Sequence, residues 1–169
     1  MNAQMYFVDI VLPTYKEFER DRLNRRRAQL ASLVLYHLLD YVNADTGGKK
    51  GDLGLLLEAT RKRCSAFQGI EAIANGTKHV EVRGPDHFSP ADIAAYSAGT
   101  ILDRLNTEQG MVREFKTERS MFWFDFKDQR YFVDVALFAT LTYLAEEHGL
   151  DGADGIENPM QLIYRDTCA

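Results

Sequence analysis

The sequence feature that most constrains the fold is a long apolar stripe with helical spacing. Between Arg20 and Val42 the apolar residues recur at steps of three, four or seven, at Leu23, Leu30, Ala31, Val34, Leu38 and Tyr41. This spacing puts one face of a helix against a core. Thr14 and Glu17 have the spacing of a capping box that precedes it. Residues 43–48 are Asn-Ala-Asp-Thr-Gly-Gly, a composition typical of loops, and they predict the end of the helix.

A second helix is predicted from Asp52 to about Asn75. Its apolar positions are Leu55, Leu56, Ala59, Cys64, Phe67, Ile70 and Ile73. Gly76 is the residue type that ends helices in the left-handed conformation. Because the loop between the two helices is short, we expect them to pack as an antiparallel hairpin.

After this hairpin the apolar period changes to that of strands. Aromatic and β-branched residues favour a small antiparallel sheet. Strands are predicted at 80–83, 111–116, 121–126 and 131–133. Residues 89–105 fit either a capped helix or a strand. A last helix from Asp134 to His148 is followed by Gly149, a residue type that stops helices.

These elements predict an α+β fold: a long antiparallel helical hairpin, a small antiparallel β-sheet and a C-terminal helix. A chain of 169 residues fits one domain. We place that domain at residues 1–150, followed by an acidic, partly flexible tail at 151–169. Two cysteines, no apolar run of about 18 residues and no signal peptide favour a cytoplasmic protein that does not cross a membrane.

The histidines and cysteines do not predict a metal site or a cofactor. The four histidines are His37, His79, His87 and His148. None has metal-ligand spacing to another histidine, cysteine or carboxylate. His37 lies on the apolar stripe, which predicts a hydrogen-bonded core histidine, and Cys64 is expected to be a packed, inert thiol. No phosphate loop or dinucleotide motif is present.

One run concentrates groups that carry chemistry. Asn75, Lys78 and His79 gather an amide, a cation and an imidazole at the predicted end of the second helix. Histidine can act as a general acid or base near neutral pH, and lysine can hold a phosphate. Structural roles are also possible, because Asn and Gly end helices and cations suit a helix C-terminus. Both interpretations stay open.

The predicted hairpin brings an arginine-rich segment to this run. If two straight helices pair antiparallel, positions whose numbers sum to about 95 lie at one level. This places Arg20 near Asn75, and Asn24 and Arg27 near Glu71. Arg20, Asn24 and Arg27 are therefore candidate substrate-binding residues beside the candidate catalytic residues His79, Asn75 and Lys78.

Three stretches resemble a family of uncharacterised bacterial proteins. They are the segment from Val11 to Phe18, the end of the first helix at Leu39–Val42, and the run from Ile73 to His79. The similarity extends through the predicted strands and the last helix. It implies a family without implying an activity.

The segment from Ala74 to His79, on a helical hairpin, also resembles the HEPN superfamily, which includes toxin and defence ribonucleases. The family motif joins an arginine and a polar residue to a later histidine. Here Asn75 matches the polar position and His79 the histidine, while Ala74 occupies the arginine position. The resemblance implies a homodimer built around the motif.

Three functions are consistent with these residues. The first is a non-catalytic HEPN-like domain that binds a protein or nucleic-acid partner, since the motif lacks its arginine. The second is a metal-independent ribonuclease that uses His79, with Lys78 and either Arg20 or Arg27 holding phosphate. The third is a small-ligand binder that uses the aromatic segment from Phe122 to Phe132, although alternating aromatic residues more often form core.

Overall fold

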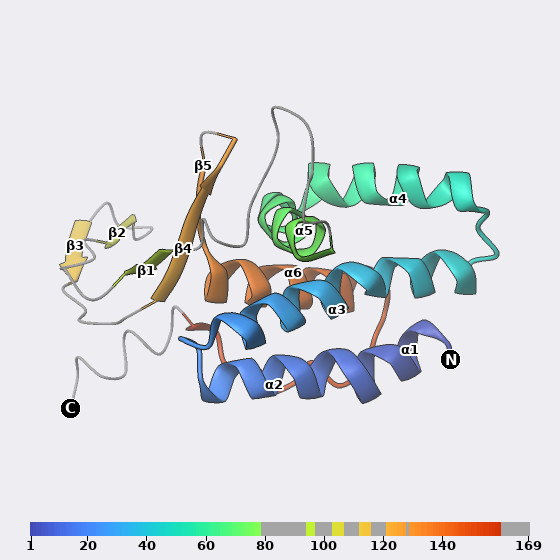
Figure 1. Ribbon diagram of the computed structural model, residues 1–169, viewed down its shortest axis with the longest axis horizontal. Coiled ribbons are helices and arrows are strands. Elements are labelled where there is room, and N and C mark those ends of the chain that lie inside the picture. The colour runs from blue at the N-terminus through green and yellow to red at the C-terminus, as the bar shows by residue number, and fades with distance from the viewer. Residues whose placement is uncertain (79–93, 97–102, 107–111, 116–120, 128, 160–169) are drawn as a thin grey trace.

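The computed structural model describes residues 1–78, 94–96, 103–106, 112–115, 121–127 and 129–159 (Figure 1). Helices make up most of these residues, and two short antiparallel sheets complete them. The predicted α+β class is confirmed. No helix within the described ranges is long and apolar enough to span a bilayer.

The N-terminal segment forms a helix that the sequence did not predict. α1 (Ala3–Tyr6) continues through a π-helical turn, η1 (Phe7–Val11), into α2 (Leu12–Arg20). Pro13 therefore lies in the first turn of α2, where its missing N–H is tolerated after the wider turn. Thr14 does not start a new helix, since its hydroxyl donates to the Ile10 carbonyl at 2.7 Å.

Both predicted long helices are present in altered form: the first begins later than predicted, and the second is divided into two. α3 spans Arg25–Asp45, and its start is separated from α2 by residues 21–24. α4 (Lys50–Arg63) and α5 (Ser65–Lys78) replace the single second helix. They are separated at Cys64, which has an extended backbone (φ −125°, ψ 95°). Figure 1 shows α4 running back along α3, so the predicted hairpin is formed by α3 and α4.

The strands form two sheets. In the first, β1 (Ala94–Tyr96), β4 (Met121–Phe126) and β5 (Gln129–Phe132) lie in the order β1-β4-β5. In the second, β2 (Asp103–Asn106) pairs with β3 (Val112–Phe115). Three predicted strands, β3, β4 and β5, are confirmed with small shifts in their ends. Between residues 89 and 105 the described residues are strand, and the predicted strand at 80–83 lies outside the described residues.

α6 (Val133–Glu147) follows β5 directly and forms the centre of the core. Its buried residues include Leu137, Leu141 and Leu144, and it packs against α3 and α5. The predicted cap, Asp134, lies inside the first turn, and Phe132 holds the N-cap position. Gly149 ends the helix region at φ 60°, as predicted.

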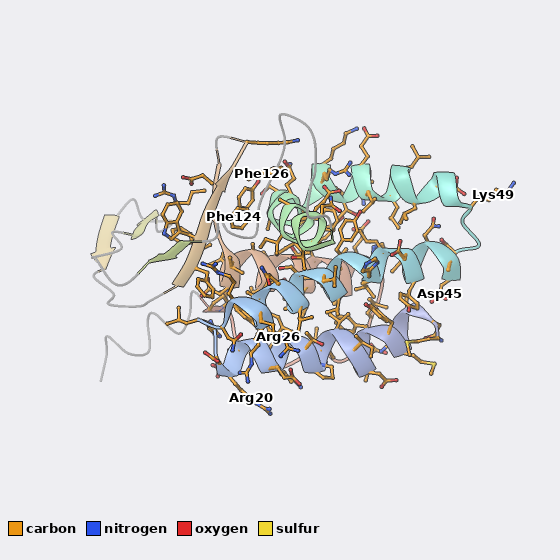
Figure 2. The ribbon with its side chains drawn as sticks, in the orientation of Figure 1. Arg20, Arg26, Asp45, Lys49, Phe124 and Phe126 are labelled. Carbon is orange, nitrogen blue, oxygen red and sulfur yellow. The ribbon has the colours of Figure 1, made fainter. Side chains whose placement is uncertain are left out.

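The strands pack on α5 through a close contact. Phe124 of β4 is fully buried and stacks on Tyr131 of β5, with ring centroids 5.3 Å apart. Figure 2 shows Phe124 and Phe126 extending from β4 toward α5. Gly69 of α5 lies against the Tyr131 ring, since a Cβ atom there would be 2.6 Å from Tyr131 Cδ1. The break at Cys64 turns α5 away from the direction of α4 and lets it reach this surface.

Candidate functional site

Asn75 lies near the end of α5, and its side chain is half-buried. α5 continues through the buried Gly76 to Lys78, so the prediction that Gly76 ends this helix is wrong. The Thr77 hydroxyl donates to the Ile73 carbonyl at 2.7 Å inside the last turns. The side chain of Lys78 and the whole of His79 lie outside the described residues. Their catalytic role stays a prediction.

Arg20, Asn24 and Arg27 lie together where α2 turns into α3. The Asn24 side chain caps α3 by accepting from the Arg27 backbone N–H at 3.2 Å, and it donates to Asp21 at 3.1 Å. Arg27 Nη1 donates to the Glu17 carbonyl at 3.1 Å and lies 3.6 Å from the Asp21 carboxylate. Asn24 and Arg27 therefore build the connection between the two helices.

Arg22 holds the same connection against the core. Its guanidinium lies 3.6 Å from Glu19 on α2 and 3.6 Å from Asp134 on α6. Only 15% of the Arg22 side chain is exposed, and Nη1 is buried without a hydrogen bond in the described part of the chain. Burial raises the pKa of Glu19 above its ordinary value. The start of α3 is thus fixed by ionic contacts on its inner side.

The outer side of this connection carries exposed cations. We call residues 16–27 the basic turn, because six Lys or Arg and three Asp or Glu give it a net charge of +3 in a chain of net charge −5. Lys16, Arg20, Arg25 and Arg26 are exposed. Among the described residues, Arg20 and Arg26 have no hydrogen bond or ion pair. Figure 2 labels both near the end of the helical part where α2 turns into α3, away from Asp45 and Lys49.

The helix dipole does not favour the three arginines at the start of α3. Arg25, Arg26 and Arg27 occupy its first turn, and no acidic residue accompanies them there. The N-terminus of a helix carries a partial positive charge, so each cation there is unfavourable by about 0.3–1 kcal/mol at an exposed position. An anion bound outside this turn would be attracted both by the arginines and by the partial positive charge of the helix N-terminus.

The structure does not join the basic turn to Asn75. Asn75 makes no hydrogen bond to Arg20, Asn24 or Arg27, and Figure 1 shows α3 between α2 and α5. The sequence analysis placed Glu71 beside Asn24 and Arg27. In the structure Glu71 instead accepts two hydrogen bonds from Arg61 of α4, both at 2.6 Å. The predicted pairing of two straight helices is wrong, because the helices are interrupted at residues 21–24 and at Cys64.

The other titratable groups singled out by the sequence have local partners or are buried. His37 Nδ1 is 2.5 Å from Asp40 Oδ2, which confirms the predicted hydrogen bond, although the ring is only half-buried. Cys64 is buried. Burial lowers the pKa of His148, which lies just after α6. Within the described ranges no group of three His, Cys, Asp or Glu residues is arranged to hold a metal ion.

A second exposed feature lies on the β4–β5 hairpin, and the sequence analysis missed it. Trp123, Asp125 and Arg130 lie on the face opposite Phe124 and Tyr131, because side chains alternate along a strand. The register pairs Asp125 directly with Arg130. Opposite charges five positions apart across a predicted turn were the signal that could have revealed it.

No family model, no curated protein and no solved structure matches this chain.

Proposed function

We propose that this chain is a non-catalytic, HEPN-like helical domain that binds nucleic acid through the basic turn. The observation that supports the proposal is the set of arginines around the first turn of α3, where they oppose the helix dipole. Arg20 and Arg26 are exposed and unpaired within the described residues. Arginine side chains beside a helix N-terminus match the geometry and charge of phosphate oxygens.

The fold suits such a role because side-chain contacts tie the basic turn to neighbouring helices. Asn24 caps α3, and Arg22 lies beside Glu19 of α2 and Asp134 of α6. Arg27 donates to the Glu17 carbonyl of α2. The exposed arginines are thus carried on a fixed backbone. A fixed cationic surface loses less conformational entropy on binding than a mobile one.

A binding assay tests this proposal. Fluorescence anisotropy would measure the affinity for a labelled 20-nucleotide RNA of wild type and of the double variant Arg20→Gln/Arg26→Gln. We expect a loss of about tenfold or more at low salt. The matched control, Lys49→Gln/Lys62→Gln, removes the same charge from exposed positions elsewhere, and should change the affinity little.

Two results would overturn the proposal. One is an equal loss in both double variants, which would mean attraction by charge in general. The other is no RNA binding by the wild type, while an acidic protein partner is captured through the same arginines. That second result would assign the basic turn to protein recognition.

The alternative function is a metal-independent ribonuclease that uses His79. Its support is the resemblance of Asn75 and His79 to the HEPN motif. An RNA cleavage assay in the presence of a chelator should then show activity that His79→Ala abolishes. The same resemblance supports a homodimer, which sedimentation equilibrium would measure. Equal cleavage by both proteins, or none, excludes this ribonuclease.

A further inference from the structure

The β4–β5 hairpin presents two faces of different character. Phe122, Phe124 and Tyr131 lie on the inner face and are buried against the helices. The sequence pattern therefore correctly favoured core over a ligand pocket for the alternating aromatic residues. Trp123, Asp125 and Arg130 occupy the outer face, where Trp123 is half-buried and both charged residues are exposed.

Among the described residues, Asp125 and Trp123 both contact the guanidinium of Arg130. Asp125 accepts hydrogen bonds from Nε at 2.9 Å and from Nη2 at 3.0 Å, which is the bidentate arrangement. The central guanidinium carbon lies over the Trp123 ring, 3.9 Å from its centroid. The hydrogen bonds from Arg130 lower the pKa of Asp125, so the carboxylate stays charged at neutral pH.

The guanidinium-bearing side chain of Arg130 remains partly exposed to solvent. The Arg130 side chain remains 54% exposed although it touches both Trp123 and Asp125. Guanidinium planes and aromatic rings are the surfaces on which proteins stack unpaired nucleobases. A guanidinium already fixed on a tryptophan needs no reordering before it accepts a base.

A surface hollow of about 560 Å³ adjoins this group and is lined by Asp125, Phe126, Lys127 and Arg130. Lys127 lies at the turn with φ 50°, a left-handed conformation that residues other than glycine rarely adopt. Its ammonium lies 5.4 Å from the centroid of the Phe126 ring. At the tip of the hairpin the hollow thus brings together two cations, the Asp125 carboxylate and the edge of the inner face at Phe126. Cations and aromatic rings are the side chains that bind phosphate and base in single-strand sites.

We propose that Trp123 and Arg130 form a stacking platform for one base of a single-stranded nucleic acid. This inference rests on the proposed binding of phosphates by the basic turn. Figure 1 shows the hairpin and the start of α3 toward the same end of the molecule. A paired base cannot offer its face to the platform, so the platform confers preference for single strands over duplexes.

The test compares Arg130→Lys with wild type, because lysine keeps the charge but lacks the plane. Labelled single-stranded oligoadenylate of 20 nucleotides and a 20-base-pair RNA duplex are the two probes. We expect Arg130→Lys to lose about fivefold or more in affinity for the single strand, the effect of one stacked base. Its affinity for the duplex should stay unchanged. Circular dichroism and thermal melting of the variant check that the fold is intact.

Trp123 gives an independent measurement because it is the only tryptophan in the chain. Adding oligoadenylate should change its fluorescence in wild type, and less so in Arg130→Lys. A matched control is Lys127→Gln, which removes a charge from the hollow but leaves the platform. It should weaken binding of the single strand through the lost charge, but it should retain the fluorescence change, because Trp123 and Arg130 are unaltered.

The outcomes separate this inference from the proposed function. If Arg20→Gln/Arg26→Gln weakens RNA binding while Arg130→Lys and the fluorescence show no effect, the platform is wrong and the basic turn stands. If Arg130→Lys weakens single-strand binding but the arginine double variant does not, the platform stands and the basic turn is wrong. If neither probe binds the wild type, both proposals fail.

Discussion

Gly69 shows how closely a single residue can be determined by packing. A Cβ atom at this position would lie 2.6 Å from Tyr131 Cδ1 and 2.9 Å from Tyr131 Cγ, in a ring that is itself buried against Phe124. We expect Gly69→Ala to lower the free energy of unfolding by about 1–3 kcal/mol, because the ring must move within a packed core. Urea denaturation would measure the change.

Gly54 provides the matched control for this substitution. It lies in α4, it is exposed, and no atom would lie within 4 Å of an added Cβ. Gly54→Ala should therefore raise stability by about 0.5–1 kcal/mol through helix propensity alone. If both substitutions stabilise the protein, the result would contradict the close packing of Gly69 against the Tyr131 ring.

Tyr6 makes stability depend on alkaline pH. It is buried and stacks on Tyr41 with centroids 4.0 Å apart. Burial, followed by the nearby Tyr41 and Asp40, raises its pKa to about 12. Above pH 10 the unfolded chain loses this proton while the folded chain keeps it, so stability falls as pH rises from about 10 to about 12.

The size of this effect follows from the shift, at about 1.4 kcal/mol per pH unit, or at most about 3 kcal/mol. Denaturation of wild type and Tyr6→Phe at pH 8 to 11 would measure it. The variant should lose less stability over this range, since phenylalanine has no proton to release. Parallel pH profiles for the two proteins would contradict the raised pKa of Tyr6.

Arg26 separates stability from function at one residue. Arg26→Glu replaces a cation by an anion in the first turn of α3, so it should raise the free energy of unfolding by about 0.5–1 kcal/mol. The same change should weaken RNA binding. Thermal melting and anisotropy on one sample would show opposite effects. A less stable variant would mean that Arg26 makes a structural contact.

At the level of elements, the corner between α4 and α5 depends on one ion pair. Arg61 donates two hydrogen bonds of 2.6 Å to Glu71, whose side chain is 15% exposed. Glu71→Gln removes the charge and one good acceptor, and we expect a loss of about 1–2 kcal/mol in stability. Urea denaturation would measure it. Glu58→Gln breaks the exposed pair with Lys62 of the same helix, and should have a much smaller effect.

The elements themselves were largely predictable from periodicity, and their breaks were not. The stripe from Leu30 to Tyr41 identified α3, and alternating aromatic residues identified β4 and β5. Cys64 gave no local signal, since cysteine fits a helical apolar position. The helix ends there because α5 must turn to reach Tyr131 and α6, and that requirement comes from distant parts of the chain.

The candidate site was predictable only in part, for the same reason. The arginine cluster near residue 25 was visible in the sequence, and Arg20, Arg25 and Arg26 are exposed where α2 turns into α3. Its predicted neighbour, Asn75, depended on the assumption of two unbroken helices. The four residues from Asp21 to Asn24 separate α2 from α3 and invalidate that register. Local sequence patterns identify candidate residues, whereas contacts between residues far apart in the sequence depend on where each helix is interrupted.

For the whole molecule, the distribution of charge matters more than its total. A net charge of −5 repels nucleic acid at long range, while the basic turn has a net charge of +3. The proposed binding therefore requires short-range contacts between arginines and phosphates, which release counterions. Each such contact to a single strand contributes a slope of about −0.7 to the logarithm of affinity against the logarithm of salt concentration.

This predicts a specific salt dependence. If Arg20, Arg25 and Arg26 each hold one phosphate, the slope for single-stranded RNA should be near −2, and affinity should fall by roughly 20-fold between 50 and 200 mM salt. Anisotropy titrations at several salt concentrations would measure the slope. Arg26→Gln should make it shallower by about 0.7, whereas Lys49→Gln should not. A slope that stays the same in Arg26→Gln would mean that Arg26 touches no phosphate, and the basic turn would lose its support as the binding site.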